Sequence, residues 1–179
     1  YGEESIELSQ AATETGLLLI RVGGRYDLAE PYIERALRLS RKVFGTDHRE
    51  TGYALHDLAV VRHEVRPADF ASRIEPLIRE AIAVRRRVIG PEHKETAGSE
   101  RTLAAFLVGS WQRQTVGDAG SPLLIEADEL VAHALPVMAR ELGRGQFEVT
   151  ELRYLQVEIA LARRDFNLAA SLAQDLIDR

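Results

Sequence analysis

Apolar residues recur along the chain at spacings of three and four, which is the pattern of amphipathic helices. The clearest case is residues 25–44, where Tyr26, Ala29, Ile33, Ala36 and Leu37 fall on one helical face. The pattern predicts eight helices, over residues 5–22, 25–44, 48–65, 70–89, 94–114, 123–142, 147–163 and 166–177. Because prolines and aromatic residues are few, short β-strands with frequent turns are not expected, and the fold class is all-α.

One stretch of sequence occurs twice, at an offset of 45 residues. Residues 41–51 read RKVFGTDHRET and residues 86–96 read RRVIGPEHKET, with six of eleven positions identical. Gly45 and Gly90 are expected to end a helix in the left-handed conformation. Asp47 then has the spacing to Glu50 of a capping box, and His48 and His93 are expected to cap helices or bridge adjacent repeat units.

Tandem repeats of helix pairs predict a stacked array, because one amphipathic pair cannot bury its own apolar face. We therefore expect an α-solenoid of four antiparallel helix pairs, in one domain over residues 1–179 that belongs to a larger protein. The repeat units cover approximately residues 5–45, 46–90, 91–143 and 144–179. Small residues are expected where helices cross, at Ala29, Ala36, Ala59, Ala81 and Ala104.

The repeat also carries a recognisable motif. Gly24-Arg25-Tyr26-x-x-Ala29-Glu30-Pro31-x-x-Glu34-Arg35-Ala36-Leu37, followed by Lys42-Val43-Phe44-Gly45 and then by Leu55-x-x-Leu58-Ala59, resembles a tetratricopeptide repeat. It is most similar to the long-period variety found in kinesin light chains and in many bacterial signalling proteins. The resemblance implies a right-handed superhelix with a concave and a convex side. Arg62 and Leu107 stand where the family usually has an aromatic residue, and Glu100 where an apolar residue is usual.

In this family the first helix of each pair lines the concave groove, and the resemblance assigns partner-binding positions on that basis. In the second unit they are Tyr53, His56, Asp57, Val60, His63 and Glu64, and in the third Arg101, Thr102, Ala105 and Val108. The less certain positions in the first unit are Glu14, Thr15, Leu18 and Arg21. Tyr53 would stack on a partner and Arg101 would pair with a carboxylate, whereas the open alternative is an ordinary hydrated surface. An Asn that clamps a peptide backbone is common where Asp57 and Thr102 stand, and neither residue reproduces its amide.

Composition narrows the classes of partner. The net charge of −5 disfavours direct nucleic-acid binding, which needs a basic face. No apolar run approaches the roughly 20 residues of a membrane span. The lack of cysteine excludes disulfides and fits an intracellular, cytoplasmic location.

No catalytic motif is present, so no enzymatic activity and no cofactor are expected. The glycine-rich residues 117–121 lack the lysine of a phosphate-binding loop and are interpreted as a connection. His56 and His63 are about 10.5 Å apart along a helix, which is too far to share one metal ion. Arg85, Arg86 and Arg87 point about 100° apart and are interpreted as a solvated helix surface. Trp111 is expected in core or inter-repeat packing, and His133 is given no special role.

These patterns favour a non-catalytic module that binds a protein or peptide in the groove. A second interpretation stays open, that of a ligand-sensing repeat domain from a bacterial transcription regulator or a STAND-type ATPase switch. The last helix keeps an apolar stripe, formed by Leu168, Ala169, Leu172, Leu176 and Ile177. Self-association or further repeats would cover this stripe.

Overall fold

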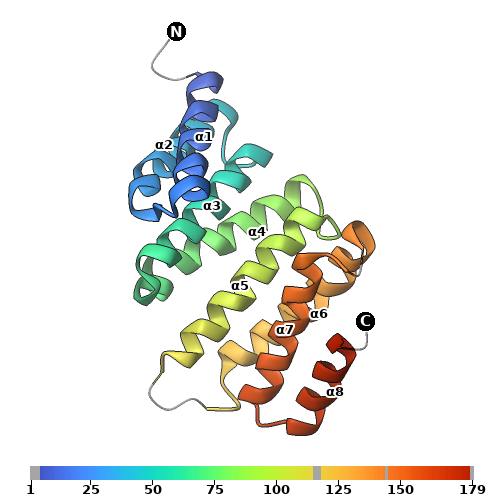
Figure 1. Cartoon of the computed structure of the whole chain (residues 1–179). Helices are drawn as coiled ribbons and strands as arrows, with labels where there is room; N and C mark the ends of the chain where they lie inside the picture. The colour runs from blue at the N-terminus through green and yellow to red at the C-terminus, as the bar shows by residue number, and fades with distance from the viewer. Residues whose placement is uncertain (1–4, 115–117, 144, 178–179) are drawn as a thin grey trace. The chain divides into compact units, whose positions relative to one another are not determined.

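The computed structural model describes residues 5–114, 118–143 and 145–177, and its regular elements in these ranges are helices (Figure 1). The chain divides into two compact units, Tyr1–Pro91 and Glu92–Arg179. The first unit holds α1 (Ile6–Gly23), α2 (Tyr26–Phe44), α3 (Arg49–Val65) and α4 (Glu75–Val88). The second holds α5 (Lys94–Gln112), α6 (Pro122–Leu142), α7 (Phe147–Ala162) and α8 (Phe166–Ile177). The division lies beside Gly90, next to the expected end of the second repeat unit, and the prediction of a single domain stays a prediction.

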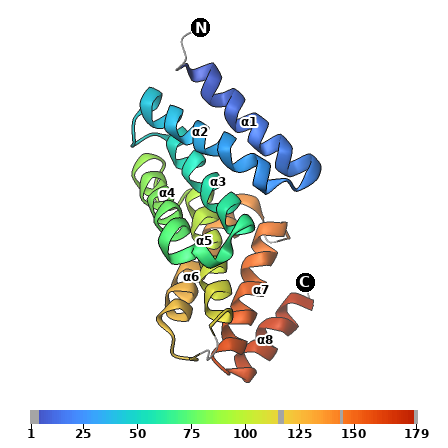
Figure 2. The same ribbon diagram turned by 90° about the vertical axis from the view of Figure 1, so that its left-hand side faces the viewer.

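Successive helices pack against each other within each unit, and the helix pairs are antiparallel (Figures 1 and 2). In the first unit α2 packs against α1 on one side and α3 on the other, and α3 in turn packs against α4. In the second unit α6 lies between α5 and α7, and α8 packs against α7. The predicted all-α fold of helix pairs is confirmed.

The core of the first unit joins α2, α3 and α4. Ile33 and Leu37 of α2 share one buried cluster with Leu55 and Leu58 of α3 and with side chains of α4. Every alanine expected at a helix crossing is fully buried, namely Ala29, Ala36, Ala59, Ala81 and Ala104. Since a larger side chain would not fit at such a position, these alanines set how closely the helices approach.

Glycine follows a helix end at the same place in three repeats, as the repeat frame requires. Gly45, Gly90 and Gly143 have φ angles of 88°, 93° and 95°, and a Cβ at each would meet nothing within 4 Å. The expected left-handed helical conformation is wrong in detail, because ψ is 177° at Gly45 and 151° at Gly143. This extended conformation at positive φ is open essentially to glycine alone. Glycine therefore lets the chain leave these helices without a steric clash.

Histidines cap two of the helices. The Nδ1 atom of His48 accepts a hydrogen bond from the amide of Glu50 at 3.2 Å, and His93 does the same with Glu95 at 3.2 Å. The capping role predicted for these histidines is confirmed, and the assignment of Asp47 as the cap is wrong by one residue. The Asp47 carboxylate is instead engaged in an ion pair with Arg87 of α4.

The fourth helix begins later than the sequence predicts. Residues 67–69 form a 3-10 turn and residues 70–74 a π-helical turn, so that α4 itself starts at Glu75. Pro76 explains the wider turn, because its ring would collide with the carbonyl four residues back in a regular α-helix. Phe70 and Ile74 are nevertheless buried, as the apolar pattern predicts.

Pro31 also differs from its expected place in the first turn. Since α2 starts at Tyr26, Pro31 lies inside the helix and removes a backbone hydrogen bond. The carbonyl that loses this bond belongs to Asp27, whose residue is exposed to solvent. Water can then satisfy the carbonyl, and the proline is tolerated without a break in the helix.

Candidate partner-binding surface

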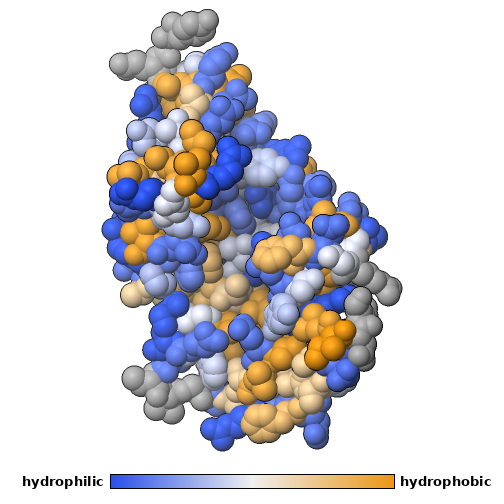
Figure 3. Space-filling view, viewed as in Figure 1, coloured by the Kyte–Doolittle hydropathy of each residue, from blue (hydrophilic) through white to orange (hydrophobic). Residues whose placement is uncertain are grey.

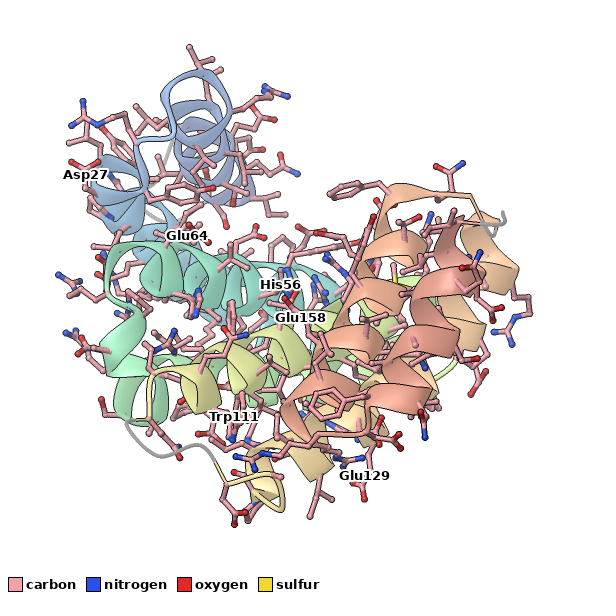
Figure 4. All side chains as sticks on the ribbon, turned by 60° about the horizontal axis from the view of Figure 1, so that its bottom comes forward. Asp27, His56, Glu64, Trp111, Glu129 and Glu158 are labelled. Atoms are coloured by element: carbon pink, nitrogen blue, oxygen red, sulfur yellow. The ribbon has the colours of Figure 1, made fainter. Side chains whose placement is uncertain are left out.

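The predicted groove residues of the second repeat unit all lie on one side of α3. Five of the six are half-buried and Glu64 is exposed, whereas the opposite side carries the buried residues Leu55, Leu58 and Val61. Figure 4 shows His56 and Glu64 projecting from this helix. The helical period alone accounts for the row, because residues 53, 56, 57, 60, 63 and 64 are three or four positions apart.

Tyr53 is held by two arginines. Its hydroxyl accepts hydrogen bonds from Nε and Nη2 of Arg49, at 3.0 and 2.8 Å. The guanidinium carbon of Arg85 lies 4.9 Å from the ring centroid and that of Arg49 lies 5.3 Å from it, both within cation–π range. A partner that stacks here would therefore meet the exposed Arg49 together with the ring.

Arg85 itself is buried, with only 5% of its surface exposed. The interpretation of Arg85–Arg87 as a solvated surface is therefore wrong for this residue, although Arg86 and Arg87 are exposed. Gly52 makes the close approach possible, because a Cβ there would lie 3.2 Å from Cγ of Arg85. The arginine stem passes over α3 at the one position that lacks a side chain.

Burial shapes the charge of Asp57. It raises the pKa of the carboxyl from about 3.8 to about 6, and the positive charge of Arg85 opposes this rise only in part. Close to neutral pH, Asp57 is therefore ionised, and its buried charge costs folding free energy. The positive charge of Arg85 reduces this cost. A partner that brings a cation or a hydrogen-bond donor to Asp57 would lower this cost.

Arg62 ties α3 to α2. Its Nε lies 3.1 Å from a Glu30 carboxylate oxygen, its Nη2 pairs with Glu34, and Arg66 contacts the other Glu30 oxygen at 2.7 Å. The side chains of Arg62 and Glu30 are only 17% and 13% exposed. An ion-paired network thus occupies the position where the family usually has an aromatic ring, and it fixes how α3 lies on α2.

The partner-binding residues predicted in the third repeat lie on α5, which belongs to the second of the two compact units. Arg101 forms an ion pair with Glu151 of α7, so its charge already has a partner within the chain. Thr102 is buried, and its hydroxyl donates to the carbonyl of Gly98 at 3.0 Å. Ala105 is exposed and Val108 is buried. Of these four positions, Ala105 presents the most open surface.

A hollow of about 250 Å³ lies in the first unit between α1, the end of α2 and the start of α3. Its lining residues are Ser9, Gln10, Thr13, Glu14, Phe44 and Glu50. The ring of Phe44 is stacked on the capping imidazole of His48, with centroids 4.5 Å apart. Of the lining residues, the sequence singled out only Glu14 as a contact. The other lining residues on α1 are Ser9, Gln10 and Thr13, and they lie within five positions before Glu14. This closeness to Glu14 in the sequence is the only signal that could have found them.

A cluster around His133 was also missed by sequence reasoning. Its Nδ1 lies 2.6 Å from an oxygen of Glu100, which is fully buried, and its Nε2 lies 3.4 Å from Glu92. Arg140 contacts Glu92 at 3.2 Å. His133 therefore has a structural role, and it explains how α5 accommodates a carboxylate where the family has an apolar residue.

Trp111 is half-buried rather than part of the core. Its indole N–H donates to the carbonyl of Asp118 at 3.0 Å and so links α5 to the connection before α6. Gly117, part of the glycine-rich stretch, lies outside the described residues. In the described remainder Gly120 donates to the Asp118 carboxylate at 2.9 Å, and Ser121 caps α6. This arrangement is a helix-capping turn.

Two further findings concern the described part of the chain only. No group of three histidine, aspartate or glutamate side chains there is placed to hold a metal ion. None of its helices has both the length and the apolar character needed to cross a membrane.

Comparison with known proteins identifies the repeat. The family model for the tetratricopeptide repeat matches residues 7–69, which include α1, α2 and α3. Residues 7–69 therefore carry the tetratricopeptide repeat. The resemblance predicted from its sequence motifs is thereby confirmed.

Solved structures show the same tetratricopeptide-type fold over the whole chain. BtubC (BKLC) from P. vanneervenii aligns with a TM-score of 0.78 and 19% identity, over 96% of this chain and 62% of that one. The present chain therefore spans less than two thirds of the length of that structure. A variant protein from Podosopora anserina, described as a kinesin light chain with nearly identical TPR-like repeats, aligns with a TM-score of 0.52 and 14% identity, over 97% and 96% of the two chains. At these identities the likeness is one of fold, and no curated protein matches the sequence.

Proposed function

We propose that this chain is a non-catalytic interaction module that binds a protein or peptide on the α1–α3 side of its first unit. Tetratricopeptide repeats in general are protein–protein interaction modules, so the class of function follows from the family. The observation that supports the particular surface is the row of α3 side chains that turns away from the core, beside the hollow formed with α1.

The chemistry of this surface suits a polar segment with some cationic character. Glu14 and Glu50 at the hollow and Glu64 farther along α3 are exposed acids. Asp57 would gain from a positive neighbour, because burial has raised its pKa. Phe44 and Tyr53 supply aromatic area, which interfaces favour because it binds at low entropic cost.

The α5 residues Arg101, Thr102 and Ala105 remain a predicted contribution from the second unit. Arg101 would have to exchange its Glu151 partner for a carboxylate of the ligand, so its contribution to affinity would be small. We therefore place the main contacts on α3 and α1.

A pair of charge reversals tests this surface. Glu64→Lys changes an exposed acid on α3, and Glu129→Lys changes an exposed acid on α6 outside the proposed surface (Figure 4). We expect Glu64→Lys to reduce recovery of a bound partner in a quantitative pull-down, whereas Glu129→Lys should leave it unchanged. Equal recovery by wild type and both variants would reject the surface.

A second pair of variants tests the hollow itself. Thr13 and Thr15 both donate their hydroxyl to the carbonyl four residues earlier on α1, but only Thr13 lines the hollow. Thr13→Arg should fill the hollow and weaken binding more than Thr15→Arg does, as measured by titration of the recovered partner. A stronger effect of Thr15→Arg would instead favour the contacts predicted for the first unit from the family alignment.

A further inference from the structure

The hollow between α1, the end of α2 and the start of α3 is lined by acidic side chains from two different helices. Glu14 comes from α1 and Glu50 from the first turn of α3. Both residues are exposed, and within the described part of the chain neither carboxylate takes part in an ion pair. Arg49 precedes Glu50, but its guanidinium donates to the Tyr53 hydroxyl at 3.0 and 2.8 Å. Since like charges repel each other, a cation that enters the hollow would be attracted by both acids.

The other polar groups of the hollow add hydrogen-bond acceptors. The Thr13 hydroxyl donates its hydrogen to the Ser9 carbonyl at 3.1 Å, so only its lone pairs are left for a ligand. The Gln10 side chain adds an amide oxygen. Of the lining residues that the structure describes, none is basic. A ligand that fits this lining therefore brings hydrogen-bond donors together with its positive charge.

One wall of the hollow is aromatic. The half-buried ring of Phe44 lines it and is stacked on His48, with the two ring planes 9° apart. The long stem of a cationic side chain packs on such apolar surface while its charged head stays among polar groups. The volume of about 250 Å³ is below the roughly 300–1,000 Å³ of small-molecule sites. The hollow therefore suits one side chain of a larger partner.

The surrounding surface favours polar recognition as well. On the face drawn in Figure 3, hydrophobic side chains gather over α7 and α8, whereas over the first unit hydrophilic side chains are interspersed with them. Without a continuous apolar patch, the position of a partner segment on the first unit depends on individual polar and charged contacts.

We propose that the hollow takes one arginine side chain of the protein or peptide partner, an inference that rests on the proposed function. The guanidinium pairs with Glu14 and Glu50, and the stem lies against Phe44. Arginine fits better than lysine, because its five donors form a planar fork that can serve acceptors on two helices, whereas an ammonium is a point charge with three donors. Because both acids are exposed, the contact fixes the place of the partner segment and adds modestly to affinity.

A pair of small probes tests the hollow without knowledge of the partner. N-acetyl-arginine amide presents one arginine side chain and no terminal charges, and N-acetyl-citrulline amide has the same shape with a neutral urea group in place of the guanidinium. In amide NMR titrations of the full chain, we expect the arginine probe to cause saturable shifts around Thr13, Glu14 and Glu50, with a Kd on the order of 1 mM. The citrulline probe should bind about fivefold more weakly or less.

Three charge-removing variants locate the site of the arginine probe. Glu14→Gln and Glu50→Gln should each weaken its binding about two- to fivefold. Glu64→Gln is the matched control, because Glu64 is an exposed acid on α3 that does not line the hollow, and it should bind like wild type. Equal binding of the two probes, equal effects of all three variants, or no saturable shift around the hollow would overturn the proposal.

These titrations fail separately from the test of the proposed function. If the arginine probe does not bind at the hollow but Glu64→Lys still lowers recovery of a partner, the arginine assignment is wrong and the binding surface stands. If the probe binds at the hollow but Glu64→Lys leaves recovery unchanged, the proposed surface is rejected, and the role of the hollow in partner binding with it.

Discussion

Asp57 shows how burial on the binding side makes a single residue sensitive to pH. Its folded-state pKa of about 6 lies above the ordinary value of about 3.8. The ionised form therefore costs stability in the folded protein above pH 6, and this cost disappears as the pH falls through 6 towards 4. Arg85 limits the cost without removing it.

We therefore expect Asp57→Asn to stabilise the protein above pH 6, by on the order of 1 kcal/mol after allowance for its partial exposure. The gain should vanish near pH 4, in thermal unfolding followed by circular dichroism. Asp27→Asn is the control, and its effect on stability should have the opposite sign, because the hydrogen bond from Arg25 lowers the pKa of the exposed Asp27. A gain from Asp57→Asn that does not change with pH would contradict the assignment of its cause.

His133 is a second residue whose environment decides its role. It contacts one fully buried carboxylate, Glu100, and one exposed carboxylate, Glu92. His133→Leu should destabilise the protein by about 1–3 kcal/mol, because Glu100 loses a hydrogen-bonding partner inside the core.

The matched control for His133→Leu is Glu92→Gln, which removes the exposed partner and should cost about 0–1 kcal/mol. Urea unfolding of both variants measures the difference. Equal effects would mean that the imidazole contributes through its surface contact and not through Glu100.

At the scale of the element, the helices and their ends were the most predictable feature. The predicted bounds differ from the observed ones by one or two residues at most ends, because apolar spacing and glycine act locally along the chain. The start of α4 was the exception, since Pro76 widens the turn before it. Caps were predicted less well, because Asp47 is drawn into an ion pair with Arg87 of another helix.

The glycine that follows α2 gives an element-scale prediction. Gly45→Ala should destabilise the protein by about 1–2 kcal/mol, because an L-residue with a Cβ rarely adopts its positive φ of 88°. Gly98→Ala, inside α5 with nothing within 4 Å of a new Cβ, should instead stabilise by up to about 1 kcal/mol. Thermal unfolding of both variants tests the pair, and a stable Gly45→Ala variant would mean that the backbone there can change its φ.

At the scale of the whole molecule, the position of a helix in the repeat series should determine its protection. The inner helix α3 packs between α2 and α4, whereas α1 and α8 each have one main neighbour. Local opening of a helix requires less free energy where fewer apolar contacts must be broken.

Amide hydrogen exchange in dilute protein should therefore be slowest in α3 and faster in α1 and α8. Uniform protection along the chain would mean that each unit opens as a whole, and would contradict the expected gradient.

The sequence by itself determined the helices, their pairing and the repeat, because apolar period, small residues and glycine placement are encoded within a few dozen consecutive positions. It also determined which side of α3 turns away from the core. Only the tertiary structure decided which charged groups are already engaged. Arg62 meets Glu30 and Glu34, Arg101 meets Glu151, and His133 meets Glu100. These partners lie 28 to 50 residues apart in the sequence, and their distances depend on how the helices pack, which no local pattern specifies.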